Sequence, residues 1–260
     1  MLRAESLLEV TSLDAAALKP SECDVSCAFD LPFERVAIDY EGREHLPDLD
    51  LLAELAGERE IRLTTPVRAD GFDPLGDDSL LSSLPEEVAH VLVAGHPAYL
   101  SAAERKRAVA PRLGAARERV GDAWVGTEGI ERIALAAGGT QYELLSRRTE
   151  RELRSLRSAG LAGDVAVYAP TVLTADEDEI LDAVGDYVSR RRPVAEALPQ
   201  GAATDSAATG RARSVLLAAA DDFALTGTPE AVGDRVRTLK EAGADVVVGY
   251  PARGVSEFVA

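Results

Sequence analysis

The feature that most constrains the fold is a series of short, continuously apolar segments that alternate with helix-patterned ones. Seven segments predict strands, namely RVAIDY (35–40), IRLTTPV (61–67), HVLVAG (90–95), RIALAA (132–137), DVAVYAPTV (164–172), DFALTG (222–227) and DVVVGY (245–250). An eighth strand is expected in LLEVTSL near the N-terminus or in DVSCAFD, residues 24–30. Strands without a polar face must be covered on both sides, as in parallel sheets flanked by helices.

The segments between these strands predict helices at 47–57, 101–120 with a break near Pro111, 140–160 and 176–191. Repeated alternation of strand and helix predicts an α/β fold, with a (β/α)8 TIM barrel as the leading architecture and a doubly wound open sheet as the alternative. We expect a single domain over residues 1–260, in which the small, polar segment 199–210 forms a flexible loop.

Composition bounds the partners and the environment. The chain has 28 basic against 45 acidic residues, a formal net charge of −17, and only 3 of the basic residues are lysines. Acidity spread along a chain keeps a protein hydrated in concentrated salt, where charge repulsion is screened, so we expect a halophilic, archaeal source. A GC-rich genome would explain the arginines but less readily the acids. Duplex DNA and anionic membranes are not expected partners.

The N-terminal segment MLRAESLLEVTSL lacks the apolar core of a signal peptide, and no run is long enough to span a membrane. The sequence therefore predicts a cytoplasmic protein. Cys23 and Cys27 are too few for a disulfide framework or a zinc site, and we interpret them as inert thiols.

The stretch FALTGTPEAVGDRVRTLKEAGADVVVGYP, residues 223–251, predicts one strand-helix-strand unit. Thr228 suits a helix N-cap and Gly243 a helix end. In a barrel, Gly227 and Thr228 would lie at the carboxyl end of the strand, where ligands bind, and their amides are candidate anion contacts. The acidic Glu230 in the first helical turn favours the simpler interpretation, which is capping.

A second anion candidate is the turn in IALAAGGTQYELLSRR. Here an apolar run leads into Gly138, Gly139 and Thr140 and then into a predicted helix with no acid before Glu143. Glycines permit close approach of a ligand to the backbone, and a helix start supplies free amides. A tight turn in which Thr140 caps the helix is the equally good alternative.

Three segments together resemble the luciferase-like superfamily of flavin- and deazaflavin-dependent oxidoreductases, which includes bacterial luciferase and methylenetetrahydromethanopterin reductase. They are residues 223–251, DVAVYAPTVLTADEDEILDAVGDYVSRR, and ALAAGGTQYELLSR. The resemblance covers the chain from about residue 131 onward. The N-terminal half shows no matching stretch, and the chain is shorter than typical members.

The resemblance implies a barrel, here shortened, that binds FMN or coenzyme F420 at the carboxyl ends of its strands and transfers hydride between the reduced cofactor and a small organic substrate. By family position, Gly138, Gly139 and Thr140 would meet the cofactor phosphate. Homo-oligomers are a further expectation. The substrate side would be shaped by the unmatched half.

The residues themselves suggest three further site candidates. His96 follows the strand at 90–95 and could donate a proton, although a loop residue with a local hydrogen bond is the alternative. Asp39 ends the strand at 35–40, where a carboxylate can orient a substrate or act as a base. Tyr250, after the last strand, is placed to stack on a planar cofactor. Thr64, Thr65, Tyr168 and Trp124 are interpreted as strand or core residues.

The sequence contains no nucleophile elbow, P-loop, GxGxxG or His-rich metal motif, which argues against nucleotide hydrolysis and a Rossmann dehydrogenase. Two alternatives to the oxidoreductase remain. One is a non-catalytic barrel kept for cofactor binding or protein contact. The other is an unrelated phosphate-binding barrel enzyme, of which Schiff-base versions are disfavoured because no lysine ends a predicted strand.

Overall fold

The computed structural model of the chain describes residues 4–259. Its parallel strands form a sheet whose order closes on itself, so the fold class is the predicted (β/α)8 barrel. The chain forms two compact units. Unit 1 comprises residues 1–14, 144–161 and 167–260, and unit 2 comprises residues 15–143 and 162–166.

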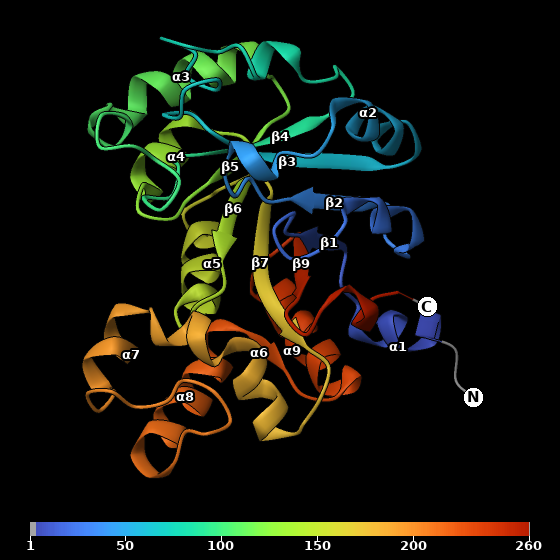
Figure 1. The fold of residues 1–260 in the computed structure, drawn as a ribbon, viewed down its shortest axis with the longest axis vertical. Helices are drawn as coiled ribbons and strands as arrows, with labels where there is room; N and C mark the ends of the chain where they lie inside the picture. Colours follow the sequence, from blue (N-terminus) through green and yellow to red (C-terminus); the bar gives the residue numbers. More distant parts are fainter. Residues whose placement is uncertain (1–3, 260) are drawn as a thin grey trace. The chain divides into compact units, whose positions relative to one another are not determined.

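Unit 2 contains six parallel strands in sequence order (Figure 1). They are β1 (Ala15–Leu18), β2 (Arg35–Ile38), β3 (Glu60–Pro66), β4 (Ala89–Val93), β5 (Trp124–Gly126) and β6 (Gln141–Leu144). The register pairs Ala17 with Ala37, and Ala37 with Arg62. Because the strands are parallel, their carboxyl ends lie at one edge of the sheet.

The connections of unit 2 include three α-helices, α2 (Leu49–Glu58), α3 (Val109–Arg119) and α4 (Glu131–Ala137). Short 3-10 helices lie at η1 (Val25–Asp30), η2 (Arg43–His45), η3 (Leu81–Ser83) and η4 (Glu104–Lys106). Leu113 of α3 and Ala134 of α4 pack against Leu92 and Val125 of the sheet, all fully buried. Between β3 and β4, residues 67–88 form a long loop with only η3 in it.

Unit 1 contains the remaining strands and helices, except that Val165 and Ala166 at the start of β7 belong to unit 2. They are α1 (Ala4–Thr11), α5 (Thr149–Ser158), β7 (Val165–Val172), α6 (Glu177–Ser189), α7 (Arg192–Ala197), α8 (Gly210–Phe223), β8 (Leu225–Thr226), α9 (Pro229–Ala242), β9 (Val246–Pro251) and η5 (Val255–Glu257). Helices α6 and α8 pack side by side through Leu181, Val188 and Leu216 (Figure 1). Asp14 joins two elements, because its carboxylate accepts hydrogen bonds from Lys240 and from the Val247 amide.

The strand predicted at 132–137 is wrong, because this segment is helix α4. Ile133, Ala134 and Ala137 pack inward at helical spacing, while Leu135 is 42% exposed. An alanine-rich segment favours a helix over a strand. Gly138, at φ +70°, ends the helix, and its amide donates to the carbonyls of Ala134 and Leu135.

Other boundaries also differ. LLEVTSL lies largely in helix α1 and DVSCAFD in η1, so neither is the missing strand, which is β1. The predicted helix 140–160 begins as β6 and becomes helical only at Thr149. The segment 222–227 contributes only the two-residue strand β8, because α8 continues through Phe223. Strand β5 and helices α7 and α8 were not predicted.

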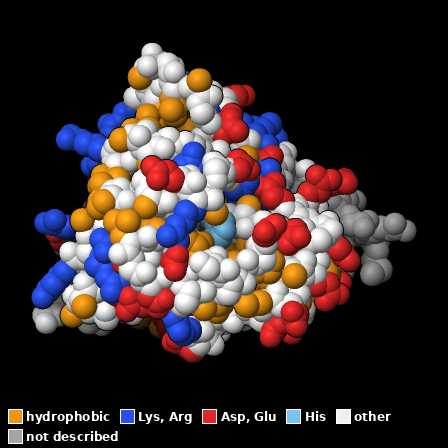
Figure 2. All heavy atoms as spheres, turned by 90° about the horizontal axis from the view of Figure 1, so that it is seen from above, with side chains coloured by type: hydrophobic (Ala, Val, Ile, Leu, Met, Phe, Trp, Pro, Cys, Tyr) orange, Lys and Arg blue, Asp and Glu red, His pale blue; other side chains and the backbone are white. Residues whose placement is uncertain are grey.

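The surface carries acidic and basic side chains close together. Figure 2 shows several groups of Asp and Glu on one face, with Lys and Arg among them. Of the described helices, none is both long enough and apolar enough to cross a membrane. The halophilic and archaeal source stays a prediction.

Two interior helix glycines provide a matched test of the fold. Gly185 of α6 faces the 199–210 loop, and a Cβ there would overlap the carbonyl oxygen of Thr204. Gly114 of α3 has open space around the same position. We expect Gly185→Ala to lower the free energy of unfolding by roughly 1–3 kcal/mol or more, because the loop backbone must shift. Gly114→Ala should instead raise it by about 0.5–1 kcal/mol. Urea unfolding followed by circular dichroism measures both, and equal effects would contradict the packing of the loop on α6.

Candidate functional site

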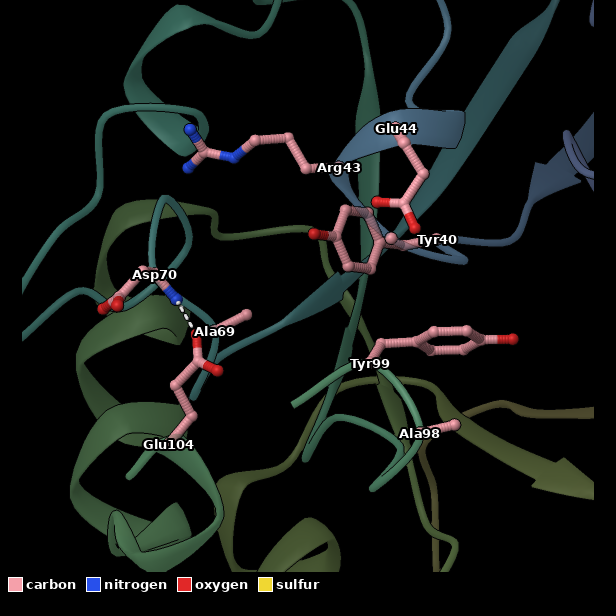
Figure 3. A pocket seen from close by; sticks show the side chains of 9 residues that line it. Tyr40, Arg43, Glu44, Ala69, Asp70, Ala98, Tyr99 and Glu104 are labelled. Atoms are coloured by element: carbon pink, nitrogen blue, oxygen red, sulfur yellow. Dashed lines mark hydrogen bonds between the residues drawn. The ribbon is translucent and has the colours of Figure 1, made fainter. Parts of the chain in front are cut away.

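A pocket of about 370 Å³ opens at the carboxyl ends of β2, β3 and β4 in unit 2 (Figure 3). It is lined by Tyr40, Gly42, Arg43, Glu44, Ala69, Asp70, Ala98, Tyr99 and Glu104. These residues come from the three loops that follow the strands. The carboxyl end of a barrel is where this fold class places its active sites, and the volume suits a small molecule.

Two side chains hold the loops after β3 and β4 together. Arg68 donates to the carbonyl oxygens of Ala94 at 2.6 Å and Gly95 at 3.1 Å. Glu104 is buried, and its two carboxylate oxygens accept the amides of Asp70 at 2.7 Å and Ser101 at 2.6 Å. Since both loops are bound by the same residues, the pocket walls that they form are fixed relative to each other.

A buried carboxylate anchors the long β3–β4 loop. Asp73 is 1% exposed and accepts from Arg112 Nε at 2.8 Å and the Leu75 amide at 2.9 Å, and Arg107 Nη1 lies 3.2 Å away. Arg107 also contacts Asp70 at 2.7 Å. The buried charge of Asp73 is thus compensated by Arg112 of α3 and by Arg107, the residue after η4, as burial of a carboxylate requires, and Arg107 also pairs with the exposed Asp70.

Asp39 lies where it was predicted, directly after β2, but it does not line the pocket. Side chains alternate along a strand, so Asp39 and the pocket residue Tyr40 lie on opposite faces. Burial raises the pKa of Asp39 to about 7; Lys19 lowers the pKa, and Glu41 and Glu22 raise it. A carboxyl group that titrates near neutrality can hold or release a proton, and its catalytic role stays a prediction.

His96 follows β4 as predicted and is exposed. Its Nδ1 accepts the Ala98 amide at 3.2 Å, and its ring centroid lies 5.8 Å from that of Tyr99. These contacts fit the loop interpretation, since His96 shapes the turn that brings Ala98 and Tyr99 to the pocket. His96 is not among the lining residues itself.

The predicted phosphate turn lies at the wrong end of its strand. Gly138 and Gly139 follow helix α4 and precede β6, so no helix begins at Thr140. They therefore lie at the amino end of β6, away from the carboxyl edge. A Cβ on Gly139 would come within 2.9 Å of the Ala123 carbonyl oxygen, which explains a glycine there by packing. The geometric basis for a phosphate contact at these residues is absent.

Gly227 and Thr228 form a helix cap. Thr228 is the N-cap of α9 and its hydroxyl accepts the Ala231 amide at 3.4 Å, while Gly227 has φ +127°. Pro229 has no N–H to offer. The preferred interpretation, capping, is confirmed, and the start of α9 leaves few donors for an anion.

Tyr250, at the end of β9, is buried and lies parallel to Tyr168, with ring centroids 6.3 Å apart. Trp124 is buried under the guanidinium of Arg62, 4.5 Å from its ring centroid, and belongs to the core as interpreted. Thr65 contacts His90 Nδ1 at 2.9 Å within the core. A cofactor contact by Tyr250 stays a prediction.

Sequence reasoning missed most of the pocket. Arg43, Glu44, Asp70, Tyr99 and Glu104 were not selected, although all follow predicted strands. One signal was available: Ser101 and Glu104 have the S-x-x-E spacing of a capping box, and the Glu104 amide does donate to Ser101 Oγ at 3.3 Å. The others are ordinary charged or aromatic loop residues in a chain rich in charge.

The fold is similar to that of two solved structures. One, an F420-dependent secondary alcohol dehydrogenase in complex with an F420–acetone adduct, has a TM-score of 0.59 at 11% identity, over 92% of this chain and 93% of that one. Another, apo-MsnO8, has a TM-score of 0.57 at 14% identity, over 94% of each chain. Both show the barrel fold that the luciferase-like resemblance implied.

The family model for a family of unknown function, DUF7388, matches residues 8–258, and the chain belongs to that family. No curated protein matches the sequence. The family description names no activity.

Asp39 and His90 make opposite contributions to the pH dependence of stability. The pKa of Asp39 rises from 3.8 to about 7, so the folded state binds its proton more tightly and stability falls as pH rises from about 4 to 7. Burial, and secondarily Arg62, lower the pKa of His90 from 6.5 to about 4, so stability rises with pH over that window.

We therefore expect Asp39→Asn to become progressively more stable than the parent between pH 4 and 7, with a ceiling of ~4 kcal/mol at about 1.4 kcal/mol per pKa unit. His90→Gln should lose stability relative to the parent as pH rises from about 4 to 6.5, with a ceiling of ~3 kcal/mol. Urea unfolding over a pH series measures both. If the stabilities of the two variants relative to the parent changed in the same direction with pH, the opposite pKa shifts of Asp39 and His90 would be contradicted.

Proposed function

We propose that the protein is an oxidoreductase of the luciferase-like type that uses coenzyme F420 or FMN to transfer hydride to or from a small organic substrate. The observation that carries the proposal is the barrel shared with an F420-dependent alcohol dehydrogenase over 92% of this chain. Two of the three resembling segments, residues 223–251 and the segment DVAVYAPTVLTADEDEILDAVGDYVSRR, fold as the resemblance implies and support the proposal. When bound, the cofactor would supply the hydride chemistry.

The pocket of unit 2 is the proposed substrate site. It is built from the N-terminal half of the chain, the half in which the luciferase-like resemblance places the substrate side. Tyr40 and Tyr99 provide aromatic surface, and Arg43 and Glu44 provide charge. Asp39, which follows β2 directly but is not among the pocket-lining residues, stays the proposed proton-holding group, because burial raises its pKa to about 7. His96 is the second candidate, through its position beside the pocket loop.

Within residues 4–259, neither predicted phosphate turn nor the pocket provides a phosphate cradle for the cofactor. Gly138, Gly139 and Thr140 lie at the amino end of β6, and Thr228 uses its hydroxyl to cap α9. The pocket has one cation, Arg43, against three acids, which disfavours an incoming phosphate. This mismatch favours a second candidate function, a barrel of the same ancestry that binds a ligand without redox catalysis.

The proposal predicts binding of the cofactor ring with little contribution from its phosphate. Fluorescence titration should show saturable binding of F420 or of FMN. The phosphate-free counterparts, the deazariboflavin core of F420 and riboflavin, should bind within about threefold of the phosphorylated forms, because no charge-assisted phosphate contact is lost.

Thr140→Ala is the control for the Gly138–Thr140 turn and should leave the affinity for the cofactor unchanged. Failure of both cofactors and both cores to bind would reject the oxidoreductase and leave the non-catalytic barrel. Phosphorylated forms that bind more than about tenfold tighter than the cores would instead reveal a phosphate contact at other residues.

A further inference from the structure

The charged groups of the pocket fall into two classes. The carboxylate of Asp70 contacts Arg107 at 2.7 Å, and Glu104 accepts two backbone amides. These acids are satisfied within the protein. Arg43 and Glu44 are exposed, and neither forms an ion pair or side-chain hydrogen bond with any residue in the 4–259 range.

Arg43 and Glu44 are neighbours of opposite charge that do not pair with each other. They begin η2, a single 3-10 turn preceded by Gly42 at φ +117°. Figure 3 shows the Arg43 guanidinium extending toward the Asp70 side of the pocket, whereas the Glu44 carboxylate turns toward Tyr40. The turn thus presents one positive and one negative group to the same pocket.

The side chain of Arg43 is placed against the β3–β4 loop. Its Nη2 atom lies 2.9 Å from where a Cβ on Gly71 would be, so a larger residue at 71 would displace it. Gly71 has φ +91°, a conformation that suits glycine. The loop therefore leaves space for the guanidinium at the pocket wall.

Tyr40 adds a neutral polar group between these charges. Its ring packs edge-on against Phe72, with centroids 5.1 Å apart, and its amide donates to Thr64 Oγ1. The hydroxyl points into the pocket in Figure 3 and makes no hydrogen bond to the described part of the chain. A fixed ring with an unsatisfied hydroxyl is suited to hydrogen-bond a ligand.

We infer that the pocket binds a small zwitterion of the amino-acid type, with its carboxylate on Arg43 and the Tyr40 hydroxyl and its ammonium group on Glu44. A simple anion would leave Glu44 unbalanced beside two further acids. A simple cation would meet the unpaired guanidinium of Arg43. A ligand carrying both charges satisfies both groups, and an arginine can bind a carboxylate through two parallel hydrogen bonds.

The volume of about 370 Å³ leaves room beside the charged groups for a side chain against Tyr99. That such a ligand is the substrate rests on the proposed function. Its binding to the pocket does not, because the lining residues all belong to unit 2 and need no cofactor.

The test is a thermal-shift screen of the standard L-amino acids at millimolar concentration, followed by calorimetric titration of the best hit. Two analogues of the same hit are also titrated, one that lacks the amino group and one that lacks the carboxylate. Arg43→Gln and Glu44→Gln are the test variants. Arg132→Gln is the matched control, because Arg132 is an exposed arginine on α4 outside the pocket.

We expect saturable binding of at least one amino acid, weakened about tenfold or more in Arg43→Gln and Glu44→Gln and unchanged in Arg132→Gln. Each single-charge analogue should bind at least about tenfold more weakly than the amino acid. Absence of any hit, equal binding of a single-charge analogue, or full affinity in Arg43→Gln would overturn the inference.

The cofactor titration separates this result from the proposed function. Amino-acid binding without binding of F420 or FMN would retain the inference and reject the oxidoreductase. The amino-acid screen is run with and without the cofactor present. Cofactor binding with no amino-acid hit under either condition would reject the inference and retain the oxidoreductase.

Discussion

The site depends on a carboxylate that is almost completely removed from water. Asp73 lies in the middle of the β3–β4 loop and is balanced by Arg112 and Arg107, which come from the next connection along the chain. A buried charge is tolerated only when it is paired, and removing one partner of such a pair costs several kcal/mol. The loop that occupies the place of a crossover helix is therefore held by this buried ion pair as well as by buried apolar side chains such as Val67 and Phe72. Ala69 and Asp70 reach the pocket wall as a result.

The parallel arrangement of the sheet explains why residues so far apart in sequence meet. Tyr40, Asp70 and Tyr99 follow three successive strands, and parallel strands end at one edge. Alternation along each strand then decides which neighbour enters the pocket. Tyr40 does and Asp39 does not, although only one peptide bond separates them. A site predicted from strand ends is right about the edge and can still be wrong about the side chain.

The sequence predicted the barrel because β2, β3, β4, β7 and β9 are rich in apolar residues without a regular polar face, and they end within about two residues of their expected limits. Helix α9 was predicted from its cap, since Thr228 and Gly243 act locally. The failures have a different cause. RIALAA satisfies both a strand and a helix pattern, and only packing of Ala134 against Val125 decides between them. Strand β5 is three residues long, too short for any periodicity. The pocket was not predictable because charged loop residues gain meaning only from their partners.

The hydrogen-bond and ion-pair partners of the acidic side chains also determine which charges the pocket presents to a ligand. Counted as residues, the pocket is acidic, with three carboxylates to one guanidinium. Counted after the internal contacts, Glu104 accepts two amides and Asp70 pairs with Arg107, which leaves Arg43 and Glu44 as the pocket charges without an ion pair to any described residue. A ligand responds most to the charges that remain, because the buried Glu104 has already exchanged water for protein donors and Asp70 has an arginine partner. The same reasoning explains why the site is poor for a phosphate, which requires an excess of donors, and suited to a molecule that carries both charges.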